Sequence, residues 1–556
     1  MLIPLFIPIL ILALGASVLV LLGAIPRMRG LHIVAVGVAG LALVALLWLG
    51  TQLPLEGMFS SWRPLALLGA PLTFDANAEN WSLAMVLAGT SFLSLLAGSV
   101  SQSRPTTANM ALILAGTGAG VAALFASSFV ALIVALCTMD ILLASALLRY
   151  GPKGARRAGL ALFSGVLATS ALWAALLLSQ VEGISGFLRL AHFTGGSASL
   201  LQMAVILRLG LVPLHLWRPI DLETEADQLM PLVVIPTLLG FHLLTYLPAL
   251  TAGLPSTLFA LAAVTVLVGG FVAWSETEER LSVAGIIMAE TGLAVLAVAN
   301  AGQQAVATAV AAAIAWVLGV TVFALGPGWS GRYFWRGAPS LLALLSLIGL
   351  PATLGFVTRF TAYSGLEADL PALIVALLGE AFVVAAIIRT WVWAEPRPLP
   401  GADPDAETHR AVRWLIEAGY LAIFALATVV LVWTGLTPDV FAGRGQVTAL
   451  PGLSDLIRQG GVAGWAGWAL PLVAGFTLFM AGEGLRQRLQ DSWRGLAGLL
   501  RLEWVYGLFF LAGRQVARLL RGAAGIVEGE GALLWTAVIL LIILLYLTSG
   551  GSGPAL

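Results

Sequence analysis

The chain is poor in charged residues. Of its 556 residues only 10% are Asp, Glu, Lys or Arg and 60% are hydrophobic, whereas about 25% charged residues is usual in soluble domains. This composition excludes an ordinary soluble domain and predicts an all-α polytopic membrane protein embedded in a lipid bilayer. The formal net charge is zero, so no nucleic-acid partner is expected.

Cysteine and lysine occur once each, as Cys137 and Lys153. A single cysteine excludes a disulfide within the chain and a metal site built from several cysteines. No Walker motif, dinucleotide-binding glycine pattern or cluster of metal ligands is visible in the sequence. We therefore expect no cofactor and no redox chemistry in this chain. The chain has 27 arginines, and no hydrophobic run contains a lysine.

Hydrophobic runs recur about sixteen times, each near the roughly 20 residues that a helix needs to cross a bilayer. They are too long and continuous for the alternating strands of a membrane β-barrel. The first run lacks a basic start and a small-residue cleavage site, so it is interpreted as a span. The expected spans lie near 2–24, 31–49, 81–102, 108–126, 128–149, 157–179, 198–219, 230–250, 256–274, 282–300, 303–325, 338–362, 370–394, 412–435, 463–482 and 531–548.

Basic residues gather in alternate loops. Arg27 and Arg29 follow the first run, and Arg149 and Lys153 follow the fifth. Such loops lie on the cytoplasmic side, which places the long loops 50–80 and 436–462 on the other. With an even number of spans, we expect a multi-pass protein of a bacterial or archaeal cell membrane with both termini on the outer side.

Four hydrophobic runs carry a lone ionisable residue. Asp140 lies in FVALIVALCTMDILLASALL, Arg208 in LLQMAVILRLGLVPLHLW and Glu290 in LSVAGIIMAETGLAVLAVA, and Arg359 follows SLIGLPATLGFVT. A charge at bilayer depth costs several kcal/mol and usually faces a bundle interior or a wet cavity. The pattern predicts a protein that handles protons or monovalent cations.

Three further residues are candidates for the same pathway. His215 in VPLHLW is either a packing histidine or a proton carrier, and His242 can titrate because free histidine has a pKa near about 6.5. Glu380 and Arg389 either line the path or pair with neighbours. Arg389 lies roughly two and a half turns further along the same helix.

Helix-breaking residues interrupt two runs, around Arg208 and before Arg359. Proline removes a backbone N–H, and broken membrane helices are tolerated where they line a cavity. The breaks are five spans apart, so the corresponding helices run in opposite directions, as in an inverted repeat; alternatively, prolines are simply common in membrane helices. The residues are Gly210, Pro213 and Pro219 in the first break, and Gly349, Pro351 and Gly355 in the second.

Segment 483–527 differs from the spans because arginines recur among Leu, Trp and Phe at roughly helical spacing. This pattern is typical of an amphipathic helix in the membrane interface. It is either a connector on the membrane surface or a brace against a neighbouring subunit.

Several segments share their order and spacing with one known family. LRLGLVPLHLWRPIDLETEA and SLIGLPATLGFVTRF resemble its seventh and twelfth helices, and SETEERLSVAGIIMAETGLAVLA resembles the start of its tenth. LGAPLTFDANAENWSLAMVLAG is similar to its hairpin before helix three, and LEWVYGLFFLAGRQVARLL to the tail before its last span. The chain thus resembles the antiporter-like membrane subunits of respiratory complex I, membrane-bound hydrogenases and multisubunit Na⁺/H⁺ antiporters.

The resemblance implies a 14-helix core with two inverted five-helix repeats, broken helices 7 and 12, and other membrane subunits of a multisubunit complex as partners. The expected parts are 1–107 with helices 1–3 and a periplasmic hairpin, 108–250 as the first repeat, 256–394 as the second, 412–482 as helices 14–15, 483–527 as the amphipathic helix and 531–548 as the last span.

The resemblance also assigns positions in a chain of polar residues near mid-membrane. Asp140 stands at the family's glutamate position in helix five, and Arg208 at its lysine position in helix seven. Arg359 stands at the lysine or glutamate position of helix twelve. Leu238 replaces a lysine one turn from His242, and Trp316 replaces the lysine of helix eleven.

Arginine stays protonated because its pKa exceeds about 12, so the missing lysines remove most of a titratable relay. Three hypotheses remain open. The first is a proton-translocating subunit with a rewired path through Asp140, His242, Glu290 and Glu380. The second is a structural or coupling homologue that has lost translocation. The third is a membrane subunit of a cation/proton antiporter or an inorganic-carbon uptake complex.

Overall fold

A computed structural model represents the chain. It describes residues 3–25, 28, 30–59, 72–100, 105–181, 188, 191, 193–215, 217, 229–247, 256–276, 278–325, 337–393, 410–438, 450–459, 461–488, 490–500, scattered positions between 504 and 521, and 536–543.

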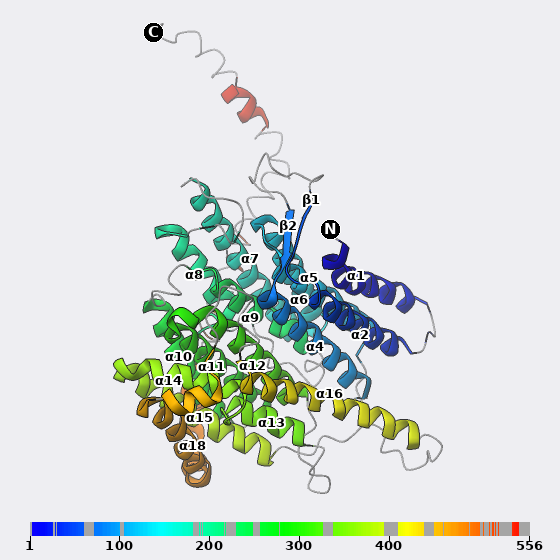
Figure 1. Ribbon diagram of the computed structural model, residues 1–556. Helices are drawn as coiled ribbons and strands as arrows, with labels where there is room; N and C mark the ends of the chain where they lie inside the picture. The colour runs from blue at the N-terminus through cyan, green and yellow to red at the C-terminus, as the bar shows by residue number, and fades with distance from the viewer. Residues whose placement is uncertain are drawn as a thin grey trace. The chain divides into compact units, whose positions relative to one another are not determined.

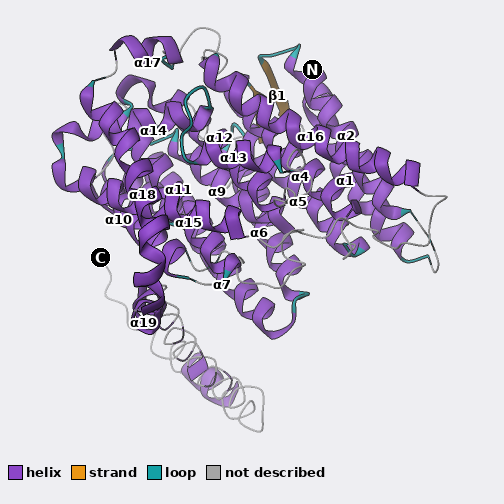
Figure 2. Cartoon of the chain, turned by 90° about the horizontal axis from the view of Figure 1, so that it is seen from below, coloured by secondary structure: helices purple, strands orange, loops and turns teal. Residues whose placement is uncertain are grey.

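The described residues are almost entirely helical (Figures 1 and 2). The long helices are α1 Ile3–Gly23, α2 Leu31–Gly50, α4 Ala78–Val100, α5 Thr107–Phe125, α6 Phe129–Leu148, α7 Gly151–Val181, α8 Gly195–Leu209, α9 Met230–Leu244, α10 Ser256–Ser275, α11 Glu279–Asn300, α12 Ala305–Leu325, α13 Ala338–Leu347, α14 Leu354–Gly365, α15 Leu370–Trp393, α16 Arg410–Leu436, α18 Val462–Arg488 and α19 Gln490–Leu500. The short helices are η4 Gly302–Gln304, η6 Leu366–Ala368 and α17 Leu453–Gln459.

Eleven described helices are long and apolar enough to cross a membrane, and four shorter apolar helices accompany them. The all-α membrane class expected from the sequence is confirmed. The expected number of about sixteen spans stays a prediction, because α8, α9, α13 and the apolar part of α16, Leu421–Leu436, are too short to count as spans on their own. Only residues 536–543 of the last expected span are described, and they are helical.

A small hairpin precedes α4. Strands β1 Leu55–Phe59 and β2 Leu72–Ala76 pair antiparallel, with Gly57 opposite Phe74. The backbone oxygen of Thr73 accepts a hydrogen bond from Ser127 N at 3.0 Å. The hairpin is therefore tied to the connection between α5 and α6.

Both breaks expected from the sequence are present. α8 ends at Leu209, and Gly210 then has a left-handed backbone with φ 61°. α13 ends at Leu347 and α14 begins at Leu354, with φ 77° at Gly349 and 74° at Ala352 between them. Positive φ is natural for glycine but strained for alanine. Pro219 of the first break lies outside the described residues.

The chain divides into two compact units, residues 1–497 and 498–556. The first unit holds all the functional residues discussed below. Within it, every residue of α9 is buried, and α12 is buried along most of its length. These helices contact each other and also α4, so they form the centre of the bundle.

Candidate functional site

Two of the lone charges meet between α6, α7 and α8. The Arg208 guanidinium donates to the Asp140 carboxylate through Nη1–Oδ1 at 2.5 Å and Nη2–Oδ2 at 2.7 Å. Nη2 also donates to Thr169 Oγ1 at 2.8 Å and to the Gly165 carbonyl oxygen at 3.4 Å. Bidentate pairing of this kind is strong and directional. The ion pair that the sequence allowed between spans five and seven is thus present, buried and matched in charge.

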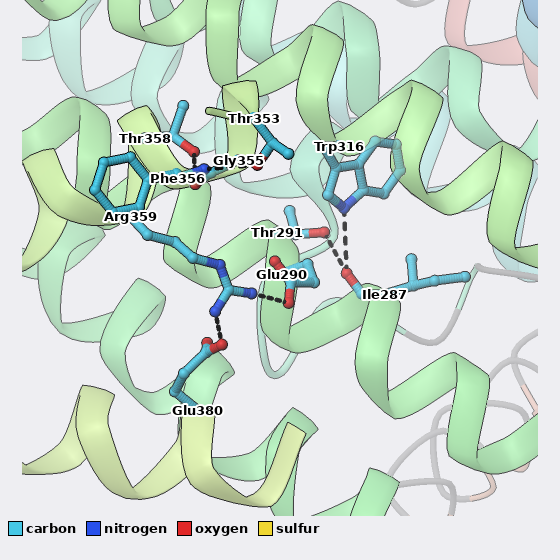
Figure 3. A network of polar contacts seen from close by, with 10 residues as sticks. All are labelled: Ile287, Glu290, Thr291, Trp316, Thr353, Gly355, Phe356, Thr358, Arg359 and Glu380. Carbon is cyan, nitrogen blue, oxygen red and sulfur yellow. Dashed lines mark hydrogen bonds and ion pairs between the residues drawn. The ribbon is translucent and has the colours of Figure 1, made fainter. Parts of the chain in front are cut away.

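Three more of the predicted residues form a second cluster, the Glu290–Arg359–Glu380 triad (Figure 3). Arg359 Nη2 donates to Glu290 Oε1 at 2.5 Å, and Arg359 Nη1 is ion-paired with Glu380 Oε1. The three side chains come from α14, α11 and α15 and are all buried. If both carboxylates are ionised, the triad carries one net negative charge.

The second break positions the arginine of the triad. A methyl group added at Gly349 would lie 2.5 Å from Arg359 Cδ, so only glycine leaves room for the arginine stem. The Gly349 carbonyl oxygen accepts a hydrogen bond from the Trp468 indole of α18 at 2.6 Å. Thr353 begins α14 by accepting from Phe356 N at 3.3 Å. These contacts satisfy backbone groups that a break leaves exposed.

A cavity of about 20 Å³ adjoins the triad. Glu290, Trp316, Ser346, Thr358 and Arg359 line it together with small and apolar residues. A cavity of this size has room for roughly one water molecule where polar groups such as these line it. The Ser346 hydroxyl has no hydrogen-bond partner among the described residues, so a water there would satisfy it.

Helix α12 separates this cavity from α9. The Trp316 indole donates to the Ile287 carbonyl oxygen at 3.3 Å, one turn before Glu290. Its ring also lies against Phe241 of α9, with 6.4 Å between the ring centres. Thr308 and Thr321 are the polar side chains of α12, which has no titratable residue. Trp316 therefore fills the place where the resemblance predicts a lysine.

The two histidines predicted for the pathway are both buried. His215 is buried in the turn that follows Gly210. His242 is buried in the last turn of α9, where its ring packs edge-on against Tyr246 with 5.3 Å between centres. Their part in a pathway stays a prediction.

Several residues of the site could not be expected from the sequence. Nothing distinguishes Gly165 or Thr169 from ordinary glycines and threonines of a membrane helix, yet both contact the Asp140–Arg208 pair. The sharing of Arg359 between two glutamates was also missed. The only available signal was that Glu290, Arg359 and Glu380 all lie inside apolar runs.

Chemically, the two clusters differ in charge balance. The first has one carboxylate for one guanidinium, whereas the second has two carboxylates for one guanidinium. Since arginine does not release its proton, only the carboxylates can titrate. Fold and site together define a multi-pass membrane protein with buried charge clusters at broken helices.

Comparisons with known proteins agree with this class. The chain is 28% identical over 483 residues to NADH-quinone oxidoreductase subunit N of Geobacter metallireducens, covering 78% of this chain and 97% of that protein. It is 27% identical over 174 residues to NADH-ubiquinone oxidoreductase chain 2 of Gallus gallus. That second match spans only 49% of the relative and 30% of this chain. No family model matches the chain.

Solved structures give the same fold. A chain of the Mrp complex from Dietzia sp. superposes with a TM-score of 0.76 at 18% identity, over 99% of this chain and 63% of that one. A chain of the archaeal membrane-bound sulfane sulfur reductase superposes with a TM-score of 0.71 at 18% identity, over 97% and 100%. The chain is thus similar in sequence to a membrane subunit of NADH-quinone oxidoreductase and shares its fold with chains of the Mrp and sulfane sulfur reductase complexes.

Proposed function

We propose that the chain is a proton-translocating subunit of a multisubunit energy-converting membrane complex, and that its proton is held by the Glu290–Arg359–Glu380 triad. The single observation that carries this proposal is that two buried carboxylates share one guanidinium. Two ionised carboxylates around one cation leave an unpaired buried charge, which is costly. Taking up one proton on either glutamate neutralises the triad.

The Asp140–Arg208 pair has a different role in this proposal. Its charges are matched and its guanidinium is held by Thr169 as well as by the carboxylate. It therefore acts as a closed ion pair that can open but cannot pass a proton through the arginine. Proton transfer between the two proposed five-helix repeats would run from His242 past α12 to the cavity beside Glu290.

Other membrane subunits of a larger complex are the proposed partners, because the matched structures are complexes of several subunits. The proposed location is a bacterial or archaeal cell membrane, with the basic loops on the cytoplasmic side and both termini outside. The proposed inverted repeat gains support from the positions of the two breaks, since each is close in the chain to a buried arginine that pairs with a carboxylate of another helix.

A test uses the complex that contains this chain, reconstituted in liposomes with an internal pH dye. Glu290→Gln and Glu380→Gln should each slow proton uptake by roughly a hundred-fold, the range that a group carrying a proton contributes. Glu367→Gln is the matched control, because Glu367 is an exposed carboxyl just after α14. Its uptake should equal that of the unaltered chain.

A second candidate is the structural homologue without translocation. Trp316 favours it, because this apolar ring lines the cavity beside Glu290 and packs against Phe241, the neighbour of His242 in α9. Uptake that survives in both glutamine variants would support this candidate and reject the first. Flux that follows a sodium gradient at constant pH would instead support cation/proton antiport.

A further inference from the structure

Helix α10 contacts both glutamate-bearing helices with consecutive residues. A methyl group added at Gly269 would lie 2.6 Å from the backbone nitrogen of Ala289 on α11, and one added at Gly270 would collide with the carbonyl oxygen of Gly379 on α15. Glu290 and Glu380 are the next residues after Ala289 and Gly379. Each carboxylate therefore projects from a point where its helix touches α10 directly.

The same contacts are tight when viewed from the neighbouring helices. A methyl group at Gly285 of α11 would lie 2.5 Å from Ala273 N, and one at Gly379 of α15 would lie 2.7 Å from Val266 O. All these contacts reach backbone atoms, which cannot move aside as a side chain can. Small residues permit such close helix packing in membranes. Here they leave no space for a larger side chain between α10 and either α11 or α15.

Arg389 ties the three helices together again at the end of α10. From α15 it donates to Trp274 O at 2.6 Å, to Ala273 O at 2.8 Å and to Ser282 Oγ at 3.0 Å. Ser282, on α11, donates to Ala273 O at 2.8 Å. The carbonyl oxygens at a helix C-terminus have no partner within their own helix. Here α11 and α15 supply the donors, and the Ala273 carbonyl oxygen accepts from both Ser282 and Arg389.

Arg359, the cation of the triad, lies on a helix that begins differently from those of the two glutamates. Arg359 belongs to α14, which starts at the second break after positive φ angles at Gly349 and Ala352. The two carboxylates thus come from α11 and α15, which both pack against α10 backbone to backbone. Their shared arginine comes instead from a half-helix that follows a strained connection.

We propose that α10 is a fixed spacer and Arg389 a positioning residue, which together set the separation at which Glu290 and Glu380 share Arg359. The inference rests on the proposed function only in taking this triad as the proton-holding group. The spacing keeps both carboxylates within reach of one guanidinium. Moving α15 outward withdraws Glu380 from Arg359, so that Glu380 binds its own proton permanently.

The test compares Gly270→Ala and Arg389→Gln with the unaltered complex. Infrared spectroscopy detects the C=O stretch of a buried protonated carboxylic acid, and its loss in Glu380→Gln identifies the band. We expect both variants to raise this band at neutral pH and to slow proton uptake at least ten-fold. Gly118→Ala is the control, because its added methyl group would meet only Leu12 Cβ at 3.3 Å and backbone atoms beyond that.

Non-additivity separates positioning from general loss of structure. Since Arg389 acts through Glu380 in this proposal, Arg389→Gln should add less than about two-fold to the effect of Glu380→Gln, whereas independent sites add their effects. Arg389→Lys supplies a second variant that keeps a donor for the α10 carbonyl oxygens and should recover part of the uptake. Full multiplication of the two effects, or an unchanged infrared band in both primary variants, would overturn the proposal.

Failure of this inference is distinguishable from failure of the proposed function. Uptake lost in Glu290→Gln and Glu380→Gln but kept in Gly270→Ala and Arg389→Gln rejects the spacer and leaves proton holding by the triad in place. Uptake kept in both glutamine variants rejects proton holding itself. The infrared band still reports whether α10 sets the contact between Glu380 and Arg359.

Discussion

Asp140 and Arg208 lie 68 residues apart in the chain and face each other with two parallel hydrogen bonds of 2.5 and 2.7 Å. Both side chains are less than 5% exposed. Arg208 occupies the last turn of α8, where the negative end of the helix dipole also favours a cation. The pair therefore closes the first broken helix against α6 and α7.

Removing one partner of this pair should cost more than removing both. Asp140→Leu leaves a buried guanidinium without its counter-charge, and breaking a buried pair typically costs about 3–5 kcal/mol. The double variant Asp140→Leu, Arg208→Met should recover at least about half of that loss, because no buried charge remains. Thermal unfolding of the purified protein in detergent measures both. A double variant less stable than the single one would contradict this prediction.

Gly165→Ala should displace the Asp140 carboxylate. The added methyl group would lie 2.5 and 2.6 Å from its two oxygens, so the carboxylate must leave its place beside Arg208. We expect a loss of about 1–3 kcal/mol, the usual cost of overpacking. Gly89→Ala on α4 is the matched control, since its methyl group meets nothing within 4 Å. The same unfolding measurement should show no loss for the control.

Trp468→Phe should make the backbone of the second break more mobile without leaving a large cavity beside it. The indole bond to Gly349 O is lost, which costs about 1 kcal/mol or more for a buried acceptor, while the phenyl ring keeps most of the contact with Phe356. Trp465→Phe alters the same aromatic cluster and serves as control. Hydrogen exchange of the backbone amides in 350–358 should rise in the first variant more than in the second. Equal exchange in both would show that the ring, not the hydrogen bond, holds the break.

Trp316→Lys places an amine beside the cavity that Glu290 lines. A buried lysine shifts its pKa readily and can exchange protons, so proton uptake in liposomes should rise above that of the unaltered chain. Trp316→Met opens similar space without a titratable group and should not raise uptake. An increase in both variants would mean that added water, rather than the amine, carries the proton.

Local signals in the sequence predicted much of this molecule. The breaks at Gly210 and Gly349 follow from glycine and proline within apolar runs, and burial of Asp140, Arg208 and Arg359 follows from the cost of charge in a bilayer. Both kinds of signal depend on composition over one or two helical turns. The structure has them where the sequence placed them.

Which faces of the helices pack against each other could not be predicted from the sequence. Whether Glu380 faces Arg359 depends on which side of α15 meets α10, and the glycines that decide it look like any glycine of a membrane helix. Arg389, expected to line the path or to pair with a neighbour, in fact binds carbonyl oxygens at the end of α10. Such contacts arise from tertiary packing, which periodicity does not record.

Because the stem of Arg359 crosses Gly349 where a methyl group would lie 2.5 Å away, the bend in the twelfth span and the cation beside it are inseparable. A larger residue at position 349 would force the Arg359 side chain to shift. If the guanidinium leaves its place, Glu290 and Glu380 face one another as like charges. A related chain without the glycine at the position of Gly349 should therefore also lack one of the two glutamates. Sequences of related chains can be searched for this paired loss.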